Sequence, residues 1–174
     1  MSNLLGLEEE NRATSAQYEA DHTETEARMK GGANWFYWIA GLTIVTSVIA
    51  FGGGGIRFLI SLGITQIIDG VAQAISTEGG GAAKVVALVL SLLISGVFII
   101  FGWLANQKML WAYIVGMVLF GLDGLLSLVA QDWIGVIAHG VVLFFLFRGF
   151  QAGRDLVSME KAMAQSAPQT EPAI

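Results

Sequence analysis

Five long apolar segments follow one another along the chain, with polar sequence at both ends. The segments cover residues 34–51, 56–75, 85–105, 109–130 and 133–150. Each is close to the ~20 residues that a helix needs to cross ~30 Å of hydrocarbon. The connections are short and rich in Gly, Asn, Gln and Asp, so neighbouring segments should run antiparallel. The pattern predicts an all-α bundle of five membrane-spanning helices.

The two polar ends carry most of the charge. Residues 1–33 hold ten of the 23 charged residues, and residues 151–174 hold five. In the first region, Glu8/Arg12, Glu24/Arg28 and Glu26/Lys30 have the i,i+4 spacing that supports a helix. We expect a partly helical, acidic tail over 1–33, which is either solvated or docks on a partner. Residues 151–174 contain both prolines and should be disordered from about Ser158.

The composition excludes several classes of protein. Only 13% of the 174 residues are charged, about half of what soluble domains carry, and a small soluble fold has no means of hiding so apolar a middle. The net charge of −5 argues against nucleic acid as a partner. The absence of cysteine excludes disulfides and thiolate chemistry. Leu4, Leu5 and Leu7 are too few for a signal peptide, so segment 34–51 should act as the insertion signal.

Aromatic and basic residues mark the expected membrane boundaries. All five tryptophans lie near segment ends, and Tyr37 and Tyr113 lie beside them, as in an aromatic belt at the lipid headgroups. Two arginines lie at the end of the last segment and should anchor it at the interface. The predicted anchors are Trp35, Trp38, Trp103, Trp111, Trp133, Arg148 and Arg154.

Segment 56–75 admits two interpretations. Gln66, Asp69 and Gln73 form a polar stripe that faces either a bundle interior or, if the helix lies flat, the membrane interface. If 56–75 does not span, the eight Lys and Arg residues near the segment ends divide six to two between the two sides, a clear positive-inside pattern with both termini cytoplasmic. If it spans, they divide three to five. A possible internal repeat favours spanning, because an Asp-Gly pair recurs 54 residues apart, at Asp69 and Asp123. In this interpretation the hairpin of segments 34–51 and 56–75 is a degenerate repeat of the hairpin 85–105 and 109–130.

Three ionisable residues, Asp69, Asp123 and His139, lie inside the apolar segments and away from their ends, and they form the candidate site. Asp123 precedes the end of its segment by seven residues, and His139 follows the start of the next by six, so in an antiparallel hairpin both lie roughly 10 Å below one interface. In this hairpin Ser127 would face Gly135, and these small residues would allow the two helices to approach closely. If 56–75 spans, Asp69 joins this polar layer, with Gln66 and Gln73 a turn to either side.

The layer has several possible roles. It could hold helix register through hydrogen bonds, or it could relay protons or cations. His139 could instead ligate haem or chlorophyll, and a three-ligand metal site from Asp69, Asp123 and His139 is a variant of the relay. Asp69 and Asp123 are also two aspartates, as an intramembrane aspartyl protease requires. No Ser/His/Asp or HExxH set is present, so we expect no enzyme, no cofactor and no resident metal.

The runs WFYWIAGLTIV, LGITQIIDGVA, GMVLFGLDGLL and AQDWIGVIAHG, within residues 34–150, resemble those of small multi-pass membrane proteins predicted from many bacterial genomes. That group has no established activity, so the resemblance implies a bundle in a bacterial cytoplasmic (inner) membrane and no mechanism. We expect a non-enzymatic accessory or structural subunit, as a homo-oligomer or within a larger membrane complex. The alternative is a small channel or proton- or cation-coupled transporter that uses the Asp/His layer.

Overall fold

The computed structural model describes residues 2–52, 82–129 and 131–166, with side chains from residue 8 onward. These residues form four helices, namely α1 (Ser2–Phe51), α3 (Ala82–Asn106), α4 (Leu110–Val129) and α5 (Trp133–Ser166). The predicted segment 56–75, with Gln66, Asp69 and Gln73, lies outside them. The fifth helix and the internal repeat therefore stay predictions.

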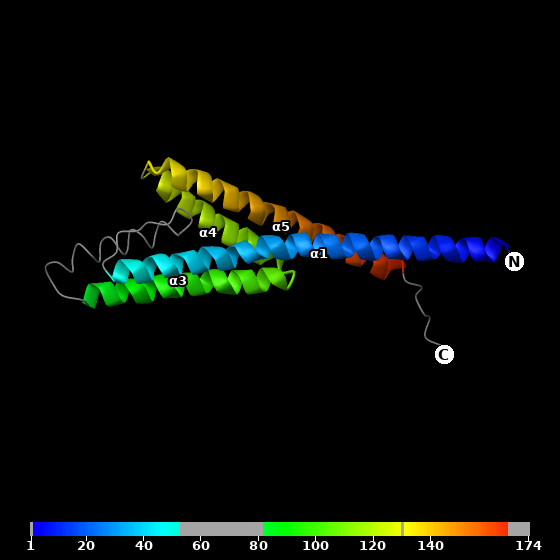
Figure 1. Ribbon diagram of the computed structural model, residues 1–174, viewed down its shortest axis with the longest axis horizontal. Coiled ribbons are helices and arrows are strands. Elements are labelled where there is room, and N and C mark those ends of the chain that lie inside the picture. Colours follow the sequence, from blue (N-terminus) through cyan, green and yellow to red (C-terminus); the bar gives the residue numbers. More distant parts are fainter. Residues whose placement is uncertain (1, 53–81, 130, 167–174) are drawn as a thin grey trace.

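The described helices run antiparallel in sequence order (Figure 1). α1 packs against α3 on one side and α5 on the other, and α4 packs against α5 and α3. All four are long and apolar enough to cross a membrane. The bounds of α3 and α4 agree to within three residues with the predicted segments 85–105 and 109–130. The all-α, multi-pass architecture is thus confirmed for the described part of the chain.

Two helices are longer than the apolar pattern indicated. α1 has no break at residues 33–34: the region expected as a partly helical tail is helical from Ser2 and continues directly into the apolar segment. α5 likewise continues past Ser158, where disorder was expected, to Ser166. Packing accounts for the parts of both extensions that adjoin the apolar segments, because Met29 of α1 and Leu156 of α5 are fully buried there. An apolar face buried against a neighbour stabilises a helix more than its intrinsic propensity does.

The two tight turns of the bundle have the same construction. Lys108, two residues after the end of α3, lies in the left-handed region (φ 63°), and so does Gln131, two residues after the end of α4 (φ 58°). In each, the next amide returns to a carbonyl five residues earlier, Met109 N to Leu104 O at 3.2 Å and Asp132 N to Ser127 O at 3.0 Å, which is the Schellman pattern. Asp132 then caps α5, because its Oδ1 accepts the Gly135 amide at 3.0 Å. Short caps of this kind fix the antiparallel pairs.

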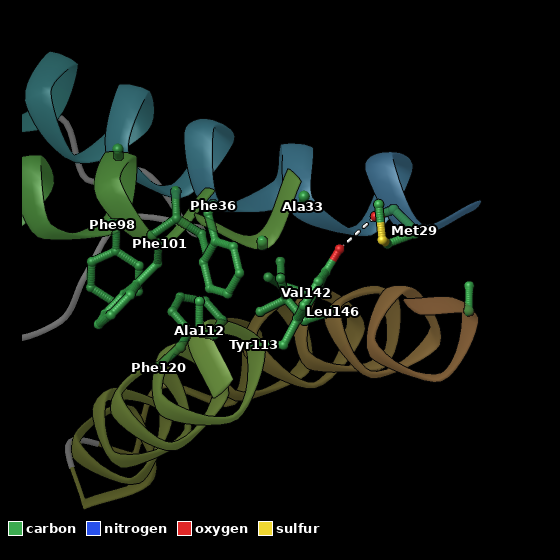
Figure 2. Packing of buried hydrophobic residues seen from close by; sticks show 14 of the residues in the cluster. Met29, Ala33, Phe36, Phe98, Phe101, Ala112, Tyr113, Phe120, Val142 and Leu146 are labelled. Carbon is green, nitrogen blue, oxygen red and sulfur yellow. Dashed lines mark hydrogen bonds between the residues drawn. The ribbon is translucent and has the colours of Figure 1, made fainter. Parts of the chain in front are cut away.

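An aromatic cluster fills the centre of the bundle (Figure 2). The ring of Phe36 on α1 lies 5.9–6.3 Å, centroid to centroid, from Phe98, Phe101 and Tyr113. Phe98 continues the contact to Phe120 at 6.4 Å. Rings at these separations and tilts attract each other beyond the effect of burial alone. Phe36 therefore joins α1 to both α3 and α4.

The outer surface of the described helices is strongly apolar. Large side chains such as Val86, Leu93, Val129 and Ile137 are more than 60% exposed. A soluble monomer rarely exposes contiguous apolar surface on this scale, whereas lipid tails solvate it at no cost. The interior, by contrast, holds several polar side chains. This inversion agrees with a multi-pass membrane protein.

Candidate functional site: a buried Asp–His pair

The predicted contact between Asp123 of α4 and His139 of α5 is present. His139 Nε2 lies 3.0 Å from Asp123 Oδ2, and each side chain is 4% exposed. The other ring nitrogen, Nδ1, lies 2.8 Å from the carbonyl oxygen of Gly135, one turn earlier on α5. Both imidazole nitrogens are thus hydrogen-bonded, and the ring is fixed in one orientation.

The partners of His139 determine where the protons of the pair reside. A backbone carbonyl only accepts, so Nδ1 must carry a proton and donate it to Gly135. The contact with Asp123 then holds one further proton, either on the carboxyl group, with Nε2 accepting, or on Nε2, with an ionised carboxylate accepting. In both forms the pair has no net charge. A buried pair of this kind avoids the cost of an isolated charge in lipid.

Close packing surrounds the imidazole. Phe120, one turn before Asp123, stacks on it with ring centroids 4.5 Å apart and an interplanar angle of 24°. On α4, a Cβ at Gly124 would lie only 3.2 Å from His139 Cβ. The sequence predicted Ser127 and Gly135 as the small residues that allow close approach. Ser127 and Gly135 are buried, but the small residue of α4 that faces the histidine side chain is Gly124.

A cavity of about 600 Å³ lies beside the pair, between α3 and α4. Of the described residues that line it, only Asp123 is polar. The lining residues are Ile94, Val97, Phe98, Leu119, Leu122, Asp123, Leu125 and Leu126. The site therefore combines an apolar hollow with a single acidic group at its wall.

Further buried hydroxyl groups lie on α1 and α3, and sequence analysis overlooked part of them. Thr43 and Ser47 on α1 and Ser91 and Ser95 on α3 are all at most 1% exposed. The Thr43 hydroxyl donates to the Ile39 carbonyl at 2.8 Å, while the Ser91 and Ser95 hydroxyls have no hydrogen-bond partner in the structure. The four-residue spacing on each helix was the available signal. Small polar residues at this spacing are typical of a close helix contact in a membrane.

Toward the other end of the bundle, the described interior is aromatic. Phe120, Phe98 and Phe36 follow the Asp–His pair, and Tyr113 closes the series (Figure 2). Tyr113 was expected at the membrane boundary but is fully buried, because its hydroxyl donates to the Met29 carbonyl of α1. Within the described residues, no ionisable side chain connects the Asp–His pair with Tyr113.

The predicted boundary tryptophans divide into two kinds. Trp38, Trp103, Trp111 and Trp133 are 52–66% exposed on the outer surface, as belt residues are. Trp35 is half-buried instead and stacks on Phe145 of α5, at 5.0 Å and 14°. It therefore also holds α1 to α5. Arg148 and Arg154 are exposed on α5.

The geometry bears on the metal and haem hypotheses. Among the described residues, no three His, Cys, Asp or Glu side chains are grouped so that they could hold a metal ion; Asp69 lies outside these residues. A haem or chlorophyll ligand needs a ring nitrogen directed at the metal, yet Nε2 of His139 is hydrogen-bonded to Asp123 and Nδ1 to Gly135. The site as built fits a hydrogen-bonded pair and not an axial ligand.

A second charged cluster joins three elements outside the apolar segments. Glu160 of α5 forms an ion pair with Lys108 of the α3–α4 turn, and its Oε1 lies 3.2 Å from His22 Nε2 of α1. Lys108, and then His22, hold the pKa of Glu160 below its usual range. Of the three predicted i,i+4 pairs, Glu24/Arg28 and Glu26/Lys30 form, and Lys30 lowers the pKa of Glu26; Glu8 and Arg12 are not paired in the described structure.

Comparison with known protein families, with curated protein sequences and with solved structures gave no significant match. The fold and the site are therefore interpreted from their own geometry.

Proposed function

We propose that this protein is a non-enzymatic accessory or structural subunit of a membrane complex, and that the N-terminal half of α1 is its docking element. The observation that carries the proposal is the projection of α1 beyond the bundle, past the end of α5 (Figure 1). Every side chain from Glu8 to Gln17 is exposed. Among the residues that the structure describes, no neighbour packs against this stretch to stabilise it.

A helix that is polar all round is unusual unless it bridges to something else. Isolated helices of this length are marginal in water, and only Glu24/Arg28 and Glu26/Lys30, both nearer the membrane, add i,i+4 support. Ala13 and Ala16 lie on the exposed stretch and offer small side chains to a partner. A binding partner would supply the missing packing, and the surplus of acidic residues suggests a basic surface on that partner.

Site-specific photo-crosslinking of the full-length protein in its native membranes tests this role. A benzoylphenylalanine at Ala16 probes the projecting helix, and one at Ala162 provides a matched control, because both are exposed alanines on extramembrane helix. The proposal expects a single crosslinked polypeptide from position 16, recovered in stoichiometric amount, and no such product from position 162. Equal labelling from both positions, or none from either, would argue against a docking role for this helix.

A second candidate function is a small channel or a proton- or cation-coupled transporter. It is favoured by the buried contact between Asp123 and His139, which lies next to a cavity of about 600 Å³. The aromatic series from Phe120 to Tyr113 is the main argument against it, since it offers no polar route through the described bundle. Flux in liposomes would decide between them. Loss of a proton flux in Asp123→Asn or His139→Gln, with folded protein retained, would favour transport over the accessory role.

A further inference from the structure

A concave site lies where α1 and α5 leave the apolar region together. Its volume is about 330 Å³. The residues around it come from two consecutive turns of each helix. They are Arg28, Gly31, Gly32 and Trp35 of α1 with Phe145 and Arg148 of α5.

Glycines create this hollow. At Gly32 the two helix backbones touch, because a Cβ there would lie 2.5 Å from Gly149 Cα. This close crossing places Arg28 and Arg148, which are 120 residues apart in the sequence, on the rim of one site. At Gly31 a Cβ would meet nothing within 4 Å, so the floor of the site is open space.

The site has an excess of positive charge. Arg28 forms an ion pair with Glu24, one turn earlier on α1. Arg148 makes no ion pair with any side chain that the structure describes. One carboxylate therefore faces two guanidinium groups, and Arg148 has all five of its N–H donors available.

The apolar side of the site places it at the membrane boundary. The stacked rings of Trp35 and Phe145 form its wall toward the bilayer. Phe36 contacts Phe101, and the ring of Phe101 meets the exposed Trp111 edge-on at 6.4 Å, so Phe36 lies at about the depth of Trp111. Gly32 lies one helical turn, roughly 6 Å, farther out along α1 than Phe36. Trp111 is a belt residue, so the arginines lie at the depth of the lipid headgroups.

We propose that this hollow binds the phosphate of an anionic phospholipid headgroup. The planar guanidinium of Arg148 matches two phosphate oxygens, and Arg28 adds a second positive charge. The Trp35–Phe145 wall receives the glycerol and the first methylenes of the acyl chains. A basic pocket between membrane helices at this depth is typical of lipid headgroup recognition. The site involves neither the Asp–His pair nor the projecting helix, so it is independent of the proposed function.

Native mass spectrometry of the delipidated full-length protein in detergent tests the proposal. The added probes are phosphatidylglycerol, phosphatidylcholine of the same acyl composition, and inorganic phosphate. Arg148→Gln removes the unpaired guanidinium, and Gly31→Leu fills the hollow while leaving both arginines in place. Arg154→Gln is the matched control, because Arg154 is also an exposed arginine on α5 but does not line the site. Unfolding of each lipid-free variant, followed by tryptophan fluorescence, establishes that it is folded.

The proposal expects one tightly bound phosphatidylglycerol per chain, with phosphatidylcholine binding more weakly. Arg148→Gln should weaken phosphatidylglycerol binding about tenfold, the lower end of what a hydrogen bond to a charged group contributes. Gly31→Leu should have a similar effect, and Arg154→Gln should have almost none. An equal loss in Arg154→Gln would mean general electrostatic attraction and would overturn the site. Displacement of the lipid by millimolar inorganic phosphate would overturn the lipid as ligand in favour of a free anion.

Discussion

Alanine in place of Gly32 should force α1 away from α5. A Cβ at this position would lie 2.5 Å from Gly149 Cα, 3.1 Å from Gly149 N and 3.2 Å from the Phe145 carbonyl oxygen. All three are backbone atoms of a continuous helix, so no side chain is able to rotate out of the way. Carbon atoms prefer a separation of about 3.5–4.0 Å, and the two helix axes would therefore have to move apart by about 1 Å.

Moving α1 away from α5 would also disturb the contacts that Tyr113 makes beside the crossing. The Tyr113 hydroxyl of α4 donates to the Met29 carbonyl of α1 beside this contact, and it also lies 3.0 Å from where a Gly149 Cβ would be. Overpacking a well-filled interior costs roughly 1–3 kcal/mol. The gain in helix propensity from glycine to alanine is about 0.5–1 kcal/mol and opposes this cost, so the raw change in stability is a poor measure of the clash.

Gly41→Ala is the control that removes the ambiguity. Gly41 lies on the same helix, and a Cβ there meets nothing within 4 Å, so it has the same propensity gain without the clash. We expect Gly32→Ala to be less stable than Gly41→Ala by roughly 1–3 kcal/mol, measured by reversible unfolding in mixed detergent micelles with tryptophan fluorescence. Equal stability of the two variants would refute the backbone crossing of α1 and α5.

Three further predictions follow from other parts of the structure. Asp123→Asn keeps a hydrogen bond to His139, because the side-chain amide N–H of asparagine donates to Nε2, and it should cost less than about 1 kcal/mol. Asp123→Leu leaves Nε2 unpaired and should cost more than Asp123→Asn; similar unfolding midpoints for the two variants would contradict this contact. Lys108 and His22 lower the pKa of Glu160, so the ion pair that joins the α3–α4 turn to α5 should be intact at neutral pH. It should be lost only when the pH falls below the usual range of a glutamate and through that lowered pKa. Faster proteolysis near the ends of α1 and α5 at low pH would report the loss, and Glu160→Gln should be cleaved at the same fast rate at every pH. For segment 56–75, single cysteines at Gly54 and Gly80 in this cysteine-free chain should react with an impermeant thiol reagent from opposite sides if the segment spans, and labelling of both from one side would exclude five spans.

Much of the described fold was predictable because lipid imposes simple rules on a sequence. A helix must satisfy all its backbone hydrogen bonds internally and needs ~20 apolar residues to cross. Runs of that length therefore gave three helix starts, those of α3, α4 and α5, to within three residues. The contact between Asp123 and His139 was predictable for the same reason: a short turn and a constant rise of 1.5 Å per residue fix depth in an antiparallel hairpin.

The sequence analysis was wrong about helix ends, and about the burial of Tyr113, where these depend on contacts with another helix. Hydropathy alone placed breaks at residue 33 and near Ser158, but α1 and α5 continue because Met29, Leu156 and Glu160 find neighbours on other helices. In the sequence, Tyr113 has the position of a residue at the membrane boundary. It is buried because its hydroxyl donates a hydrogen bond to the Met29 carbonyl of α1.

The sequence by itself thus determined that the described part of the chain is all-α, with helices long and apolar enough to cross a membrane, where α3, α4 and α5 begin to within three residues, and which two ionisable groups share a level in the α4–α5 hairpin. These are local properties, set by hydropathy and by helix rise. Only the tertiary structure decided that α1 crosses α5 at Gly32 and Gly149, that Gly124 and Phe120 enclose the histidine, and that Arg28 and Arg148 border one hollow. Such features depend on which helix faces meet, and shape complementarity between remote segments decides that.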